Sequence, residues 1–423
     1  MWGTRIGILH KEEDKPYAAF EYDRAFVRSG IELAPIMMPL SNRVFEFPDL
    51  AGDTFRGVPG LIADSLPDKF GNAVISRWLV EQGEDDGSFN VLDRLCYTGK
   101  RGMGALEYVP ATGPKADSAE AINVREMAAF ASRILQNRKK ETAVKVDDTG
   151  FEQLLKFGTS AGGARAKAII AWNERTNEIK SGQIDAGEGF DYWLMKFDGV
   201  KGNGDHDLED VPEYTLIEYA YYKMALAAGI VMNECRIYEE GSRHHFMTRR
   251  FDREKGSKLH MQTLGAIAHI DYNYPGICSY EQAAAYMRRM HLPAIDIEQL
   301  FRRMVFNVLA VNQDDHVKNI SFLMDRSGVW RLAPAYDLTF SYDMSNLWLS
   351  AHQMLINNKK EDISLADMIA CGNNMDISTR RCKSIIADVD QAVARWPQIA
   401  GEIGIKEKTT EMIRGKLFET KPV

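Results

Sequence analysis

The order of strand-forming and helix-forming segments along the 423-residue chain constrains its fold more than any other feature. Before about residue 254, short runs of apolar, aromatic and β-branched residues alternate with turns, with few helical segments between them. After that point the pattern is mainly helical, as at 297–313 and 382–396, where apolar residues recur at three- and four-residue steps. We therefore expect an α+β fold in which a strand-rich N-terminal lobe is joined to a mostly helical C-terminal lobe. Small ligands usually bind in the cleft between two such parts.

Turn-forming residues at 109–121, VPATGPKADSAEA, form the best candidate for a linker, and we place the first domain boundary there. We expect an N-terminal subdomain at 1–112, a second domain with a glycine-rich loop at 113–250, and a helical domain at 251–423 with a polar loop. Local patterns predict the elements within these domains. They are a hairpin from the runs 5–10 and 17–26, helices at 72–83, 124–137, 151–157 and 213–230, and strands at 168–172, 191–199, 235–240 and 244–252.

Composition and charge exclude several classes of function. Lys and Arg total 52 against 60 for Asp and Glu, and this net charge of −8 argues against a strongly basic surface that binds duplex DNA. The five cysteines occur singly, without a CxxC pair, which fits reduced thiols rather than a disulfide framework or a zinc site. The N-terminal residues do not resemble a signal peptide, and no window approaches about 18 uncharged apolar residues. We expect a soluble cytoplasmic protein that does not interact with a membrane.

The clearest chemical signal is a polar loop, QDDHVKN, that follows a predicted helix. The apolar run after this loop, the turn DRSG at 325–328 and the returning run VWRLA predict a β-hairpin. Because the hairpin folds back on itself, Asn319 must lie beside the segment just past Ala333. Strand geometry then brings Asp337 to within roughly 10 Å of Asn319.

The oxygen-bearing side chains of this region suit phosphoryl transfer. Asn319 and Asp337 provide amide and carboxylate oxygens, which are hard ligands of the kind that Mg²⁺ prefers. Asp314 can then accept a proton from an acceptor hydroxyl, and the spacing Asp-x-x-x-x-Asn matches the catalytic loop of protein kinases. The alternative is a solvated turn without chemistry. His316 by itself is expected to be a structural hydrogen-bonding residue.

A phosphate-binding element should accompany such a site, and FGTSAGGARAKAII at 157–170 is the candidate. Its glycines, Gly158, Gly162 and Gly163, allow backbone N–H groups to approach phosphate oxygens. The loop is neither a Walker A motif nor a GxGxxG motif, so a simple turn is the alternative interpretation.

Lys196 lies in an otherwise apolar predicted strand, DYWLMKFDG. A buried ammonium group needs a partner, and the α- and β-phosphates of ATP are suitable ones. We expect Glu218 to form an ion pair with Lys196, with Glu213 as the alternative. A surface position at the edge of the sheet is the competing interpretation for this lysine.

Eight motifs occur along the chain in a characteristic order. They are PGLIADSLPDKFGN (59–72), GKRGMGALEY (99–108), TSAGGARAK (159–167), WLMKFDG (193–199), EYAYYKMALAAGI (218–230), TRRFDR (248–253), NQDDHVKN (312–319) and RLAPAYDL (331–338). Together they resemble the HipA family of bacterial toxin kinases over most of the chain. The most specific part of the resemblance is NQDDHVKN followed by PAYDL.

The resemblance implies a bilobal protein-kinase-like fold with an extra N-terminal subdomain, and Ser/Thr phosphorylation with ATP and Mg²⁺. It makes Asp314 the catalytic base, and it makes Asn319 and Asp337 the metal ligands. Lys196 becomes the phosphate-pairing lysine, and TRRFDR becomes the hinge between the lobes. In the nucleotide site, Phe251 would lie near the adenine and Asp252 near the ribose. The other residues that we assign to this site are Glu218, Ser160, Gly162, Gly163, His316 and Lys318. The roles of His316 and Lys318 are left open.

The resemblance also implies regulation and partners. Ser160 matches the serine that family members autophosphorylate, an event that ejects the glycine-rich loop and inactivates the kinase. The family's substrates are aminoacyl-tRNA synthetases, whose modification stalls translation and arrests growth. The usual partner is a HipB-type helix-turn-helix antitoxin that binds operator DNA, so contact with DNA would occur mainly through the antitoxin.

The sequence departs from related kinases at several positions. Arg249 stands where the family hinge often has an acidic residue, and Arg165 and Ala166 replace the more usual Gln-Glu. Ordinary protein kinases have His-Arg before the catalytic aspartate, whereas Asn312 and Gln313 precede Asp314. We therefore do not expect control by phosphorylation of an activation loop.

Two other functions compete with the kinase. A catalytically silent HipA-like subunit would bridge an antitoxin dimer on DNA, but the intact set of Asp314, Asn319, Asp337 and Lys196 argues against such decay. A metallophosphoesterase could use the Asp-Asp-His run. A two-metal site needs several more ligands, however, and the nine histidines show no matching cluster in the sequence.

Overall fold

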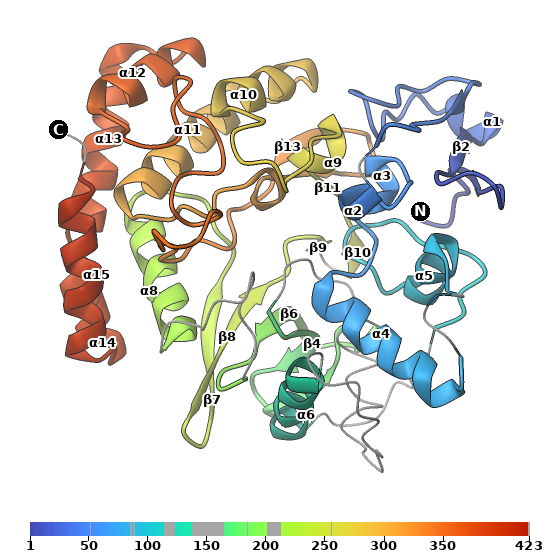
Figure 1. Ribbon diagram of the computed structural model, residues 1–423, viewed down its shortest axis with the longest axis horizontal. Coiled ribbons are helices and arrows are strands. Elements are labelled where there is room, and N and C mark those ends of the chain that lie inside the picture. Colours follow the sequence, from blue (N-terminus) through green and yellow to red (C-terminus); the bar gives the residue numbers. More distant parts are fainter. Residues whose placement is uncertain are drawn as a thin grey trace. The chain divides into compact units, whose positions relative to one another are not determined.

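The computed structural model describes residues 1–50, 52–84, 87, 89–113, 123–137, 165–183, 185–200, 213–254 and 256–421 (Figure 1). Contacts divide the chain into two compact units. The strand-rich unit comprises Met1–Thr4, Asp64–Thr215 and Glu234–His260, and the helical unit comprises Arg5–Ala63, Leu216–Asn233 and Met261–Val423. Each unit draws on separate stretches of sequence, and the predicted division into domains at 1–112, 113–250 and 251–423 stays a prediction.

The elements carry the labels of Figure 1. The strands are β1 (Gly7–His10), β2 (Ala19–Tyr22), β3 (Val44–Phe45), β4 (Lys167–Asn173), β5 (Glu178–Ser181), β6 (Asp191–Lys196), β7 (Cys235–Glu240), β8 (Arg243–Arg249), β9 (Arg253–Glu254), β10 (Ser257–Lys258), β11 (His260–Thr263), β12 (Ser321–Met324) and β13 (Trp330–Leu332). The helices are α1 (Arg24–Val27), α2 (Gly52–Phe55), α3 (Gly60–Ala63), α4 (Lys69–Gln82), α5 (Val91–Thr98), α6 (Val124–Asn137), α8 (Tyr214–Ala227), α9 (Leu264–Ala268), α10 (Tyr280–Arg289), α11 (Ala294–Leu309), α12 (Leu365–Asn374), α13 (Thr379–Val393), α14 (Trp396–Ile403) and α15 (Glu407–Glu419), with a 3₁₀ turn, η3 (Val317–Asn319).

The strand-rich unit is built on an antiparallel sheet with the strand order β5-β4-β6-β8-β7. Strand β4 is buried along most of its length, as expected for an apolar run in the middle of a sheet. Helices α4 and α6 pack against each other and share a core with the sheet (Figure 1). That core includes Phe70, Val74, Met127, Phe130, Ile170, Trp193, Met195 and Met247.

Most of the elements predicted for this unit are confirmed. The strands expected at 168–172, 191–199, 235–240 and 244–252 correspond to β4, β6, β7 and β8, and the helix expected at 124–137 is α6. Strands β6 and β8 end sooner than predicted, at Lys196 and Arg249. The helix expected at 151–157 lies outside the described residues.

Helix α4 shows how local sequence decides where an element begins and ends. Its N-cap is Asp68, whose carboxylate accepts a hydrogen bond from the N–H of Gly71 at 2.5 Å. Its C-cap is Gly83, with a φ of 75°, a left-handed conformation that glycine adopts without steric cost. The predicted end at Gly83 is confirmed, but the helix begins at Lys69, before the predicted start, because Asp68 caps it there.

The helical unit contains the hairpin of β1 and β2, which confirms the hairpin predicted near the N-terminus. Helix α11 packs against α10 and α13, and its residues from Leu300 to Leu309 are buried. The helix predicted over 382–396 is wrong at its end, because α13 stops at Val393 and Trp396 begins α14, which has Pro397 in its first turn. No helix among the described residues is long and apolar enough to cross a membrane.

Candidate active site

The polar loop begins at the end of α11. The side-chain amide of Asn312 donates a hydrogen bond to Oδ1 of Asn307 at 2.9 Å, and its backbone N–H donates to the carbonyl of the same residue at 2.9 Å. Both asparagines are buried, Asn312 to 1% exposure. These contacts tie the start of the loop to the last turns of the helix, which fixes where the loop leaves it.

Asp314 lies further along this loop with a half-exposed side chain, 48% of which is accessible. The side-chain amide of Asn319 donates to the Asp314 carbonyl at 2.8 Å, so the loop is closed by its own last residue. Nε2 of His316 lies 3.8 Å from Oδ1 of Asp314. The predicted base thus lies on a loop whose backbone is held by a hydrogen bond between two of the loop's own residues.

The predicted hairpin after the loop is confirmed by the antiparallel pairing of β12 with β13. Asp325 organises its turn by accepting hydrogen bonds from the N–H groups of Ser327 at 2.8 Å and Val329 at 3.2 Å. The N–H of Ala333 donates to the carbonyl of Ser321 at 2.8 Å, which extends the pairing by one step. The segments on either side of the hairpin therefore leave it side by side.

Tyr336 joins these two segments. Its hydroxyl donates to the carbonyl of Lys318 at 2.6 Å and also contacts the hydroxyl of Ser321. The residue after it, Asp337, has a backbone φ of 53°. Residues other than glycine rarely adopt this left-handed conformation, which recurs at functional sites. The hairpin and Tyr336 thus hold the loop of Asp314 and Asn319 against the loop of Asp337, as the sequence predicts.

The oxygen atoms presented here are chemically suited to Mg²⁺. Since the amide nitrogen of Asn319 donates to the Asp314 carbonyl, its amide oxygen faces away from that contact. Asp337, a half-buried residue, would add a carboxylate oxygen, so the donor set would be one amide and one carboxylate oxygen, as expected for a metal that keeps water and phosphate ligands. Among the described residues, no group of three or more His, Cys, Asp or Glu side chains is arranged as a metal site.

Lys318 and His316 lie together against Tyr272. The Lys318 ammonium is 4.3 Å from the centre of the Tyr272 ring, a cation–π contact, and the His316 ring centre is 5.5 Å from the same ring. The His316 ring is thereby held beside Asp314, and the Lys318 ammonium packs on the other partner of that ring, Tyr272. Their roles toward nucleotide stay predictions.

Lys196 stands at the end of β6 in the strand-rich unit and is only 7% exposed, so the surface alternative is wrong. It pairs across the sheet with Phe246 on one side and with Lys167 on the other. Glu218 is 2% exposed in the part of α8 that belongs to the helical unit. The ion pair of Lys196 with Glu218, and the alternative pair with Glu213, stay predictions.

Lys167 is a candidate that sequence reasoning overlooked. It opens β4, is 4% exposed, and forms an ion pair with Asp68 at 3.4 Å. Two buried lysines directly opposite one another on adjacent strands repel, unless anions lie near them. The sequence feature that could have identified Lys167 is its position at the start of an apolar strand, directly after the glycine-rich segment. That segment, with Ser160, Gly158, Gly162 and Gly163, lies outside the described residues.

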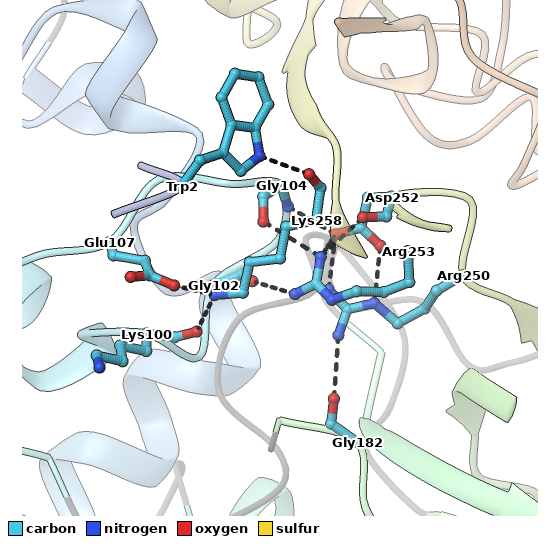
Figure 2. A network of polar contacts seen from close by, with 10 residues as sticks. All are labelled: Trp2, Lys100, Gly102, Gly104, Glu107, Gly182, Arg250, Asp252, Arg253 and Lys258. Carbon is cyan, nitrogen blue, oxygen red and sulfur yellow. Dashed lines mark hydrogen bonds and ion pairs between the residues drawn. The ribbon is translucent and has the colours of Figure 1, made fainter. Parts of the chain in front are cut away.

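Asp252 is buried among charged partners, which the sequence did not indicate. Figure 2 shows its carboxylate accepting hydrogen bonds from Arg250 at 2.7 and 2.8 Å, from Arg253 at 2.6 Å and from the N–H of Gly104 at 2.7 Å. Burial alone would raise the pKa of Asp252, but the two guanidinium charges outweigh it and hold that pKa well below its usual range. The carboxylate therefore has a structural role, and the assignments of Asp252 to ribose and Phe251 to adenine stay predictions.

The same network connects separate segments of the strand-rich unit (Figure 2). Arg253 also donates to the carbonyl of Gly102 at 3.3 Å, and Arg250 donates to the carbonyl of Gly182 at 3.5 Å. Lys258 forms an ion pair with Glu107 at 2.7 Å. The motif GKRGMGALEY is thereby fastened to the segment that follows β8.

Two family models match the chain. The model of the HipA N-terminal domain matches residues 1–109, and that of the HipA-like C-terminal domain matches residues 159–396, more than half of the chain. The chain belongs to the HipA family. The resemblance seen in its motifs is therefore confirmed.

The fold of this HipA-family protein is similar to that of HipA from Shewanella oneidensis, solved in a complex with HipB and operator DNA. The TM-score is 0.63 at 17% sequence identity, over 98% of this chain and 93% of the other. The likeness confirms the predicted fold class, an α+β kinase-like fold with a strand-rich N-terminal lobe and a mostly helical C-terminal lobe.

Two curated relatives share part of the sequence, and both carry the name "Putative kinase". One, from Haemophilus influenzae, is 29% identical over 159 residues, which cover 33% of this chain and 46% of that protein. The other, from Sinorhizobium fredii, is 26% identical over 203 residues, which cover 44% of this chain and 47% of that protein. The chain thus spans less than half the length of each relative.

Proposed function

We propose that this protein is an ATP- and Mg²⁺-dependent Ser/Thr protein kinase and the toxin of a toxin–antitoxin pair. The observation that carries the proposal is the joining of two loops by Tyr336, whose hydroxyl donates to the Lys318 carbonyl at 2.6 Å. One loop carries Asp314 and Asn319, and the other carries Asp337. A general base and two oxygen ligands on joined loops are what phosphoryl transfer requires.

In the proposed reaction, a serine or threonine hydroxyl oxygen forms a bond to the γ-phosphorus while the bond from that phosphorus to the β–γ bridging oxygen breaks. The hydroxyl proton goes to the Asp314 carboxylate, and ADP leaves. Asn319 and Asp337 would hold Mg²⁺, which in kinases neutralises phosphate charge. Lys196 and Lys167 would pair with phosphate oxygens, since both are buried cations on one sheet.

The proposed partners follow from the family. A HipB-like antitoxin would bind this protein and would carry most of the contact with operator DNA, in keeping with the chain's net charge of −8. The HipA of Shewanella oneidensis was solved with HipB and DNA, which supports this part of the proposal. We propose an aminoacyl-tRNA synthetase as the protein substrate, autophosphorylation of Ser160 as self-inactivation, and action in the cytoplasm.

The test is the intact mass of the purified protein before and after incubation with ATP and Mg²⁺. We expect the gain of one phosphate, mapped by fragmentation to Ser160, and no gain when EDTA removes the metal or when Ser160→Ala replaces wild type. A phosphate at another residue would refute the self-inactivation site but not the kinase. A protein that neither gains phosphate, nor starts phosphorylated, nor binds ATP would instead be the silent bridging subunit.

Replacement of the proposed metal ligand tests the cofactor separately. We expect Asp337→Ala to lower the rate of phosphate incorporation at least about 100-fold, because several kcal/mol of charge stabilisation are lost with the metal. The Mg²⁺ concentration that gives half-maximal rate should rise as well. The matched control is Asp343→Ala, since the Asp343 carboxylate accepts hydrogen bonds from Ser345 in its own turn and from no other residue that the structure describes. Equal metal dependence in the two variants would exclude Asp337 as a ligand.

A further inference from the structure

Asp315 directly follows the proposed base, but its side chain is in the opposite situation. Its side chain is fully buried, whereas that of Asp314 is 48% exposed. A buried carboxylate is costly unless hydrogen bonds satisfy it. Its partners are the hydroxyl of Tyr280, which donates at 2.8 Å, the backbone N–H of Gln353, which donates at 2.7 Å, and Nδ1 of His352 at 3.1 Å.

The Tyr280 hydroxyl extends this cluster to helix α11. It accepts a hydrogen bond from the side-chain amide of Asn307 at 2.9 Å, and Asn307 in turn accepts from Asn312 at the start of the polar loop. Burial, with a further effect of the Asp315 charge, raises the pKa of Tyr280 well above its usual value. The tyrosine therefore keeps its proton and remains a donor to Asp315.

The other partners of Asp315 come from the segment after Asp337. The start of that segment lies against the polar loop, since the N–H of Gln313 donates to the carbonyl of Ser341 at 2.9 Å. Its end lies against the start of α10, since the N–H of Tyr280 donates to the carbonyl of Leu355 at 3.0 Å. Between these contacts, His352 and Gln353 reach Asp315 and are themselves only 5% exposed.

We propose that Asp315 is a positioning residue that holds the loop of Asp314 to the segment 341–355, so that the site is assembled without a phosphorylated residue. The inference rests on the proposed kinase function. In kinases regulated by phosphorylation, new arginine–phosphate pairs order the activation loop. Here Gln313 precedes Asp314, and three buried hydrogen-bonding partners converge on a carboxylate in the catalytic loop itself.

The test compares Asp315→Ala, Asp315→Asn and Tyr280→Phe with wild type in the full chain. Asp315→Ala removes the shared acceptor, and we expect the rate of phosphate incorporation at saturating ATP to fall about 100-fold, as for misplaced reacting groups. The Kd of ATP should change less than about threefold, because the Asp315 carboxylate is fully buried and its oxygens are hydrogen-bonded to Tyr280, His352 and Gln353. Asp315→Asn keeps an acceptor for Gln353 and offers a donor to the Tyr280 oxygen, so it should restore most of the rate.

The matched control is Asp367→Ala. Asp367 is also a buried carboxylate of the helical unit, and it accepts hydrogen bonds from Asn357 and Lys359, each at 2.8 Å. Hydrogen exchange of the backbone amides at 311–319 and 341–355 provides a readout that needs no activity. We expect faster exchange there in Asp315→Ala and not in Asp367→Ala.

The outcomes separate the two proposals. Equal rates and equal exchange in Asp315→Ala and Asp367→Ala would overturn the positioning role. A wild type without phosphoryl transfer would defeat the proposed function, while exchange would still decide whether Asp315 holds the two segments together. If Asp315→Ala does not fold, Tyr280→Phe decides: we expect a rate about tenfold lower at unchanged Kd, and an unchanged rate would refute the inference.

Discussion

Asp314→Asn should abolish phosphate incorporation, with a loss of about 1,000-fold or more, because the variant cannot accept the hydroxyl proton. Folding should be unaffected, since the side chain is 48% exposed and the hydrogen bond from Asn319 that closes the loop is accepted by the Asp314 backbone carbonyl. The Kd of ATP should also stay near its wild-type value. The measurement is the initial rate of phosphate gain by intact mass, together with an ATP titration.

Asp325→Asn is the matched control for this substitution. Asp325 is a carboxylate in the turn of the hairpin that follows the loop, and its role there is to accept hydrogen bonds from Ser327 and Val329. An asparagine oxygen can do the same, so the control removes a charge without disturbing the turn. A rate for Asp314→Asn within tenfold of the control would exclude Asp314 as the base.

Asp252→Ala should destabilise the strand-rich unit by about 3–5 kcal/mol in its free energy of unfolding, a cost typical of breaking a buried ion pair. The side chains of Arg250 and Arg253 are 1% and 10% exposed, and the substitution would leave both without their carboxylate. Urea denaturation gives the free energy. Hydrogen exchange in β4 and β6 shows whether the loss is located in this unit.

The ionised Asp252 carboxylate should make the free energy of unfolding decrease as the pH falls. The pKa of Asp252 is depressed in the folded protein below its ordinary value of 3.8. Its stabilising contribution is therefore fully present above that ordinary value and is lost as pH falls toward the folded pKa. Acidification below about pH 4 should narrow the difference in stability between wild type and Asp252→Ala.

Asp191→Ala is the control for the ion pair. Asp191 pairs with Arg249 in the same unit, and the two side chains are 52% and 45% exposed, so the loss should be about 1 kcal/mol or less. A stable Asp252→Ala variant with weakened ATP binding would contradict the structural role of Asp252. It would support instead the ribose contact that the family resemblance implies.

Local sequence patterns were sufficient where local forces decide the structure. The hairpin β12–β13 could be predicted because Asp325 and Gly328 specify its turn and apolar strands flank it. The pairing of strands then requires that Asn319 and the segment of Asp337 leave the hairpin together. The core of the candidate site was thus predictable without knowledge of any distant contact.

Other features depend on contacts between residues far apart in the chain. The partners of Asp252 could not be predicted from the sequence, because they include the N–H of Gly104, a residue 148 positions away, as well as Arg253. Lys167 and Lys196 become neighbours only through the register of β4 and β6. No periodicity or spacing encodes such a register.

The sequence by itself indicated the family, the α+β class, several of the long helices and sheet strands, and the residues whose oxygens can serve phosphoryl transfer. The family followed from the resemblance of its motifs, and the other features followed from turn chemistry, apolar periodicity and the short hairpin, which are local. Only the tertiary structure decided that Asp314 is half exposed while its neighbour Asp315 is buried. The reason is physical, because burial and charge pairing depend on which distant groups the fold brings to a side chain. Two adjacent aspartates look the same in the sequence, so the sequence alone does not show which of them will be buried.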